Sequence, residues 1–238
     1  MIINKPAGLS WEQAAGVPEA WITATQALWL VGAFEPGMRV LMHAGASGVG
    51  IAAIQLARAH GAAEIFVTAG SKEKIEFCKS MGATDGFNYK EQDWAEEVLA
   101  QTDGEGVDLI IDPVGQSHFA GNLKCAAKDG AVVMLGFMSG PVVKEVNLGP
   151  ILSKRLRLEG TTLRSRDLKY QGKLRDQIVE QAMPRFEEGG FKVVVEKVFP
   201  WTEVCACDCS CLLLRLFAAV AHSRVVGRCA LYYCSLKT

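Results

Sequence analysis

The sequence predicts an α/β fold built on a doubly wound, parallel, six-stranded sheet, and two observations lead to it. Short apolar segments alternate with helical segments from residue 40 to residue 161. Their apolar runs are continuous, as is typical of strands that helices cover on both faces. The first run also passes through a glycine-rich turn directly into an Ala/Ile-rich helix. Strands that alternate with helices at this spacing join by right-handed crossovers into one parallel sheet.

Each element follows from its local pattern. Branched and aromatic residues predict the strands, whereas apolar residues at helical spacing between polar ones predict the helices. Small and polar residues separate the elements and predict turns. The predicted strands are residues 40–43, 64–68, 86–89, 107–112, 131–135 and 156–161, and the predicted helices are 49–60, 75–81, 93–101 and an amphipathic surface helix between 165 and 190.

The turn from Gly45 to Gly50 has the context of a dinucleotide-binding turn of the Rossmann type. Its pattern is G-x-S-x-x-G with the additional Gly48, so that Ser47 stands where the usual fingerprint has its second glycine. Gly45 and Gly48 allow a ligand to approach the backbone, and Gly50 allows the helix to pack on the strand. The N–H groups that open the helix, from Val49 onward, would then face a pyrophosphate.

The end of the second strand favours NADPH over NADH. An enzyme that uses NAD usually places Asp or Glu here, where it binds the ribose 2′-hydroxyl. This chain has Ala69-Gly70-Ser71-Lys72-Glu73-Lys74. Gly70 leaves room for a 2′-phosphate, the Ser71 hydroxyl can donate to it, and Lys74 can pair with it. Alternatively, the two lysines are an ordinary solvated helix start.

Four small-residue turns follow strands of the predicted sheet, and ligands of such sheets bind beyond the carboxyl ends of the strands. We therefore expect one crevice between these turns. His43 and Asp112 lie beside it, and we interpret both as packing or turn-fixing residues, so that no catalytic residue is assigned. The four turns are residues 44–47, 69–71, 112–115 and 136–140.

Six motifs together resemble the zinc-independent quinone oxidoreductases of the medium-chain dehydrogenase/reductase superfamily. The likeness runs from about Lys5 to Val204. The motifs are His43-Ala44-Gly45-Ala46-Ser47-Gly48-Val49-Gly50, Thr68-Ala69-Gly70-Ser71, Gly82-Ala83-Thr84, Phe87-Asn88-Tyr89-Lys90, Asp112-Pro113-Val114-Gly115 and Leu163-Arg164-Ser165-Arg166.

This resemblance implies reduction of a quinone by NADPH without a metal, by a homodimer joined through the edge strand near Leu156 to Thr161. Residues 1–16 lack the pattern of a signal peptide, so we expect the cytoplasm. The resemblance also implies cofactor contacts. Ser47, Gly48, Val49 and Gly50, beside Gly45, would contact the pyrophosphate; Gly70, Ser71, Lys74 and Tyr89 would surround the 2′-phosphate; and Val114, Gly115, Leu135, Gly136, Phe137, Met138 and Leu163 would lie along the nicotinamide half. Without the resemblance, Tyr89 is equally a half-buried strand aromatic.

The chain departs from the family at both ends. Relatives begin with a GroES-like substrate domain, of which residues 1–15 resemble only the end, so we expect a truncated form. We divide the remainder into an NADPH-binding domain (16–166), a surface helix with a segment returning to the substrate domain (167–204), and a divergent tail (205–238). Six of the eight cysteines lie in that tail, in a C-x-C-x-C-x-C arrangement that is not the spacing of a structural zinc site.

Composition limits the other possibilities. A formal net charge of −1 gives no argument for nucleic acid or an anionic membrane as partner. Cations interrupt the apolar stretch of the tail, which argues against a membrane span. We interpret Cys78 and Cys125 as buried, inert thiols. Two further functions stay open: an enoyl-thioester reductase, and a non-catalytic variant that binds NADPH or pairs with the full-length enzyme.

Overall fold

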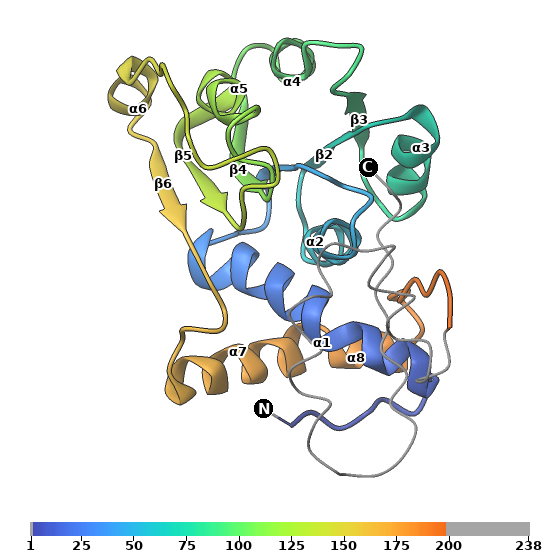
Figure 1. The fold of residues 1–238 in the computed structure, drawn as a ribbon. Helices are drawn as coiled ribbons and strands as arrows, with labels where there is room; N and C mark the ends of the chain where they lie inside the picture. Colours follow the sequence, from blue (N-terminus) through green and yellow to red (C-terminus); the bar gives the residue numbers. More distant parts are fainter. Residues whose placement is uncertain (1, 199–238) are drawn as a thin grey trace.

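The computed structural model describes residues 2–198, and predictions that concern residues 199–238 lie outside this range. Its centre is a six-stranded sheet in the order β3-β2-β1-β4-β5-β6 (Figure 1). Every neighbouring pair is parallel. The strands are β1 (Arg39–Met42), β2 (Glu64–Ala69), β3 (Asp85–Asn88), β4 (Val107–Asp112), β5 (Ala126–Met134) and β6 (Arg157–Gly160). The predicted fold is confirmed: a Rossmann sheet, without a second sheet of a GroES-like domain among the described residues.

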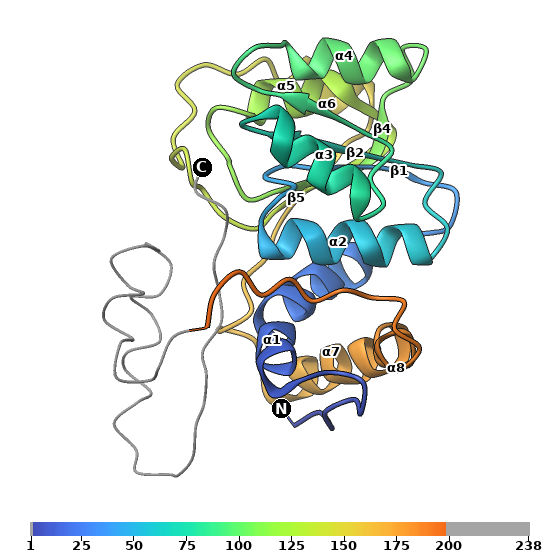
Figure 2. The ribbon, with the colours of Figure 1, turned by 90° about the vertical axis from the view of Figure 1, so that its right-hand side faces the viewer.

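Strand residues alternate between the two faces of the sheet, because successive side chains of a strand point in opposite directions. On the first face, Val40, Val67 and Leu109 join the larger core. That core is completed by α1 (Trp11–Thr25), the following π-helix η1 (Gln26–Val31), α2 (Gly48–Ala59), α3 (Lys72–Ser80), α7 (Leu168–Gln181) and α8 (Met183–Glu187). Figure 2 shows α2, α1 and α7 in succession on this side.

The second face carries a smaller core. Leu41, Phe66 and Ile110 pack there, on the opposite side from their strand neighbours. The helices that cover them are α4 (Trp94–Gln101), α5 (Phe119–Cys125) and the short α6 (Gly149–Ser153). Buried apolar residues on both faces agree with the continuous apolar runs of the sequence.

Several predicted boundaries were wrong. Helix α3 begins at Lys72 rather than Ile75, because the Ser71 side chain caps it. Strand β5 begins at Ala126, which pairs with Val107 ahead of an irregularity in the ladder. The single helix expected between 165 and 190 is two helices, α7 and α8. They are separated at Ala182, and a proline lies in the first turn of α8.

Helix α1 has no counterpart among the predicted helices, although the sequence holds its signal. Ser10 and Gln13 form a capping box: the Ser10 hydroxyl accepts from the Gln13 amide at 3.1 Å, and the Gln13 side chain accepts from the Ser10 amide at 2.9 Å. Pro18 lies inside the helix, which argues against a helix at the level of sequence. The expected division at residues 15/16 falls within α1; the proposed division into domains stays a prediction.

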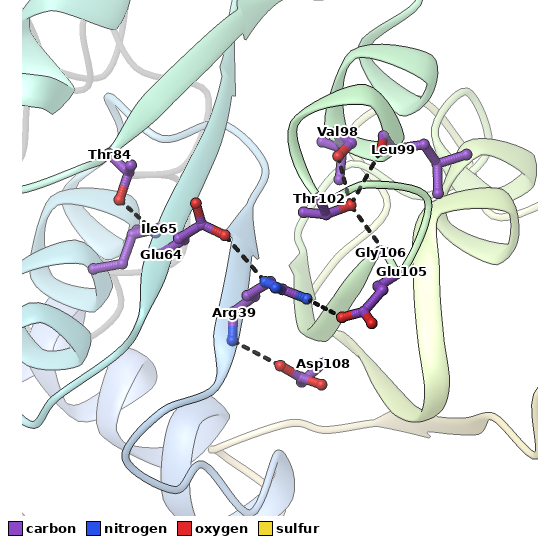
Figure 3. Close-up of polar contacts among 10 residues, drawn as sticks. All are labelled: Arg39, Glu64, Ile65, Thr84, Val98, Leu99, Thr102, Glu105, Gly106 and Asp108. Atoms are coloured by element: carbon purple, nitrogen blue, oxygen red, sulfur yellow. Dashed lines mark hydrogen bonds and ion pairs between the residues drawn. The ribbon is translucent and has the colours of Figure 1, made fainter.

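A charged cluster joins the amino ends of three neighbouring strands (Figure 3). The Arg39 amide donates to Asp108 at 2.7 Å, while its guanidinium donates to Glu64 at 3.0 Å and to Glu105 at 2.9 Å. These contacts connect the start of β1 to the start of β2 and to the segment that enters β4. They lie at the end of the sheet away from the glycine-rich turn.

No helix within residues 2–198 is long and apolar enough to span a membrane.

Candidate dinucleotide site

The glycine-rich turn leads from β1 into α2 and is held from both sides. Ala44 has a positive φ of 51°, and the Gly45 amide donates to the Thr68 carbonyl of β2 at 3.0 Å. Ser47 caps α2, and its hydroxyl accepts from the Gly50 amide at 3.1 Å. The cap leaves other first-turn N–H groups of α2 without helical partners, as at any helix start, and this gives the turn its capacity for an anion.

Two glycines of this turn are required by packing within the protein. A Cβ at Gly50 would lie 2.3 Å from the Gly45 carbonyl oxygen, and one at Gly45 would lie 2.7 Å from the Val67 Cβ. Gly50 therefore allows the helix to start close to its own turn, and Gly45 allows the turn to contact β2. Both positions exclude any larger residue unless the turn moves.

The second turn, after β2, gathers positive charge around Gly70. A Cβ at Gly70 would lie 2.9 Å from the Tyr89 hydroxyl and 3.3 Å from the Lys90 Nζ, so both side chains reach over this glycine. Burial, and then the charge of Lys90, lower the pKa of Lys74. Like charges held this close favour binding of an anion, which would relieve their repulsion.

Ser71 starts α3 in the same turn. Its hydroxyl, together with a backbone amide, lowers the pKa of Glu73, so this serine already serves a carboxylate within the protein. Glu73 itself is exposed. The turn thus combines two lysines, a phenol and a hydroxyl with one exposed carboxylate.

The third and fourth turns are joined to each other. The Asp112 carboxylate accepts from the amides of Val114 at 2.6 Å and Gly115 at 2.9 Å, which confirms it as a turn-fixing residue. The Met138 amide donates to the Pro113 carbonyl at 3.2 Å, so the turn after β5 lies on the turn after β4. Phe137 and Met138 are 52% and 59% exposed, and they present an apolar surface at the end of the sheet.

A buried polar chain supports these turns from below. Asn122 donates to Asp112 at 2.7 Å, and its carbonyl accepts from His43 Nε2 at 2.7 Å. Nδ1 of His43 is 2.9 Å from the Thr68 hydroxyl. With Nε2 donating, Nδ1 accepts from that hydroxyl, so His43 is neutral. Burial lowers the pKa of His43 to about 4, although Asp112 acts in the opposite direction.

A cavity of about 500 Å³ opens beside the first two turns. Its walls come from the first turn of α2, from α3, from the middle of α1 and from the extended segment after α8. The lining residues are Gly16, Ala20, Trp21, Ala46, Gly48, Ile51, Ser71, Glu73, Lys74, Phe77 and residues 193–197.

The structure thus distributes the predicted residues over three places. Gly48, Ser71 and Lys74 line the cavity, and Gly70 and Tyr89 meet beside it. Val114, Gly115, Phe137 and Met138 belong to the joined turns, and Leu163 packs against the first core. Lys90 is the residue that the prediction omitted from the site. Its place directly after Tyr89 in a motif of the sequence was the available signal.

The residues from 2 to 198 contain no group of three or more His, Cys, Asp or Glu side chains that could hold a metal ion. Cys78 and Cys125 are both buried in the core, and burial raises the pKa of each thiol to about 12. Their expected burial is confirmed, and thiols with so high a pKa are poor nucleophiles at neutral pH.

A parallel sheet with a capped glycine-rich turn and a second turn of positive charge has the form of a dinucleotide-binding domain. The sequence profile of the family described as zinc-binding dehydrogenase matches residues 48–180. The chain belongs to this family, within the medium-chain dehydrogenase/reductases, and it is quinone oxidoreductase-like. This confirms the resemblance found in its motifs.

Relatives of two kinds support the assignment. A zinc-type alcohol dehydrogenase-like protein of Schizosaccharomyces pombe is 33% identical over 212 residues, 85% of this chain and 57% of that protein. A quinone oxidoreductase of Pseudomonas aeruginosa is 36% identical over 154 residues, 65% of this chain and 46% of that protein. The chain therefore spans about half the length of these relatives.

Solved structures agree. The quinone oxidoreductase of Thermus thermophilus, studied also as its complex with NADPH, superposes with a TM-score of 0.75 at 28% identity, covering 89% of this chain and 66% of that one. The CurK enoyl reductase superposes with a TM-score of 0.71 at 33% identity, covering 86% and 60%. The fold and the family thus agree in indicating the dinucleotide-binding domain of a medium-chain dehydrogenase/reductase.

Proposed function

We propose that this chain binds NADPH in preference to NADH and forms the cofactor-binding half of a quinone reductase. The observation that carries the proposal is the convergence of Tyr89 and Lys90 over Gly70, beside Lys74. A 2′-phosphate at this place would accept a hydrogen bond from the phenol and pair with both ammonium groups, whereas a 2′-hydroxyl would leave the two lysines to repel each other.

The other turns fit the rest of the cofactor. The first turn of α2, capped by Ser47 and starting at Gly48, offers backbone N–H groups to the pyrophosphate. The apolar surface of Phe137 and Met138, with Val114 and Gly115 beside it, suits the nicotinamide half. When bound, the cofactor supplies a hydride, which a quinone accepts without a metal; the residues of this chain hold and orient it.

Titration of the purified chain with NADPH and with NADH, followed by nicotinamide fluorescence, tests the cofactor preference. Lys74→Met and Lys90→Met should each weaken NADPH by about tenfold or more, since hydrogen bonds to charged groups contribute roughly 1.5–3 kcal/mol. Both variants should leave NADH unchanged. Lys79→Met is the matched control: it removes a lysine from the same helix, at 2.7 Å from Asp85 and away from the cavity. Equal affinity for both cofactors would contradict the proposal.

The substrate requires a separate assay. We propose a quinone, in line with the P. aeruginosa and T. thermophilus relatives, and expect weak or no turnover from this chain alone. The second candidate is an enoyl-thioester, which the similarity to the CurK enoyl reductase favours. NADPH oxidation with an ortho-quinone and with an enoyl-thioester distinguishes the two. A rate equal to that of full-length relatives would contradict the expectation of weak turnover.

A non-catalytic role is the alternative if neither substrate is reduced. Strand β6 is at the edge of the sheet and pairs with β5. We propose that a second copy, or a longer member of the family, pairs along it. Light scattering of the purified chain, and capture of a full-length relative, test this; a monomer that captures none contradicts it.

A further inference from the structure

The extended segment after α8 is attached to the dinucleotide-binding helix by one side chain, Gln55. The carboxamide nitrogen of Gln55 donates to the Lys192 carbonyl at 3.0 Å, and its oxygen accepts from the Lys192 amide at 2.8 Å. The side chain therefore pairs with residue 192 as a neighbouring strand would. Gln55 is 7% exposed. Burial of a carboxamide destabilises the fold unless its hydrogen bonds are made.

Aromatic packing fixes the segment just before this point. The ring of Phe191 lies 4.9 Å from Trp21 of α1 and 5.5 Å from Phe186 of α8. Beyond the Gln55 contact, residues 193–198 form neither helix nor strand. Residues 191 and 192, together with Val193, which packs against the first core beside Gly16, thus contribute to the position of residues 193–197.

Residues 193–197 form one wall of the cavity that contains Gly48, Ser71 and Lys74. The segment is extended, and its side chains alternate: Val193 and Val195 are half-buried, whereas Val194 is exposed. The opposite wall is the first turn of α2, with Gly48 and Ile51. Gln55 lies on that same helix, one turn beyond Ile51. One helix thus provides a wall of the cavity and holds the segment that forms the other.

We propose that Gln55 is a positioning residue that holds residues 193–197 against the cavity, so that its carboxamide determines how tightly the dinucleotide is retained. The inference rests on the proposed function, because it takes the cavity as part of the cofactor site. It adds a residue that is not among those lining the cavity and a wall that lies far from the glycine-rich turn in sequence.

Gln55→Leu tests the proposal, since it keeps the volume of the side chain and removes both hydrogen bonds. Two hydrogen bonds of about 1 kcal/mol each correspond to roughly 30-fold faster hydrogen exchange of the Lys192 amide, which donates to Gln55. NADPH and NADH should weaken by the same factor, about three- to tenfold, because the wall does not read the 2′-phosphate. Gln101→Leu is the matched control, as its side chain is exposed and bonds to Asp85.

A second variant keeps the proposal testable if Gln55→Leu does not fold. Val195→Ala shortens the wall and leaves the anchor intact, so cofactor affinity should fall while exchange at Lys192 stays slow. Wild-type affinity with either folded variant, or unchanged exchange in folded Gln55→Leu, would overturn the proposal. The two proposals fail separately: loss of the lysine-dependent preference concerns the cofactor, whereas exchange of the Lys192 amide reports on its bond to Gln55.

Discussion

The buried histidine beneath the turns makes the stability of this domain depend on pH between about 6.5 and 4. The His43 ring is neutral in the fold, and burial lowers its pKa from 6.5 to about 4. In the unfolded chain the ring gains a proton below pH 6.5, whereas in the folded protein it does not until about pH 4. Stability is therefore fully present above pH 6.5 and declines as the pH falls toward 4.

The magnitude follows from the two pKa values. Between pH 7.5 and pH 5.0 the free energy of unfolding should fall by about 2 kcal/mol from His43 alone, and by about 3.4 kcal/mol once the pH is below both values. Burial also lowers the pKa of His118, which acts in the same direction. The pKa of Asp85 is lowered from 3.8, so the stability that this carboxylate contributes is lost mainly below about pH 3.8.

Urea unfolding at a series of pH values measures the effect, and His43→Gln should remove about 2 kcal/mol of the difference between pH 7.5 and 5.0. Thr68→Val is the matched control: it removes the hydroxyl beside Nδ1 and leaves the imidazole. It should lower stability at every pH and keep the slope. The reasoning is refuted if His43→Gln keeps the full slope, or if the ring titrates near pH 6.5 by NMR.

Three further predictions concern packing, reactivity and charge. Gly50→Ala should destabilise the domain by roughly 1–3 kcal/mol or more in urea unfolding, because its Cβ meets a backbone carbonyl at 2.3 Å. Gly172→Ala, in an open part of α7, should stabilise it by about 0.5–1 kcal/mol, and the opposite order would contradict the geometry. Cys78 and Cys125 should resist alkylation at pH 8 in peptide-resolved mass spectrometry until urea is added; rapid labelling would show that they are accessible. Arg39→Met should cost only about 1 kcal/mol in urea unfolding, because its guanidinium pairs are partly exposed; a loss above 3 kcal/mol would show that they act as a buried network.

The sheet could be predicted from the sequence because its signals are local. In a chain of this size, an apolar run such as residues 107–112 has few places to be buried other than a central strand. The alternation of such runs with helices fixes the parallel topology. The glycine-rich turn could be predicted equally well, since a capping serine and its glycines stand together in the sequence. Once the strand ends are known, the residues of the turns that follow them indicate which ligand groups could bind there.

What could not be predicted depends on contacts between distant residues. Lys90 belongs to the site only because β3 lies beside β2, which brings its side chain over Gly70. Gln55 looks like one polar residue on an apolar helix, and its role depends on a segment 137 positions away in the chain. Helix α1 was missed although Ser10 and Gln13 indicate its start, because Pro18 inside the helix gives the opposite signal.

The packing of α1 against α8 has a consequence for synthesis on the ribosome. Trp21 of α1 lies 4.5 Å from Phe186 of α8, and α1 also packs on α7. At roughly 5–20 residues per second, about 10–30 s separate the emergence of these two rings. During that interval α4 and α5 can already cover their side of the growing sheet, while the other side waits for its last helices. The nascent chain therefore has one face of the sheet covered by helices and one apolar face still exposed, and a chaperone would bind the exposed face.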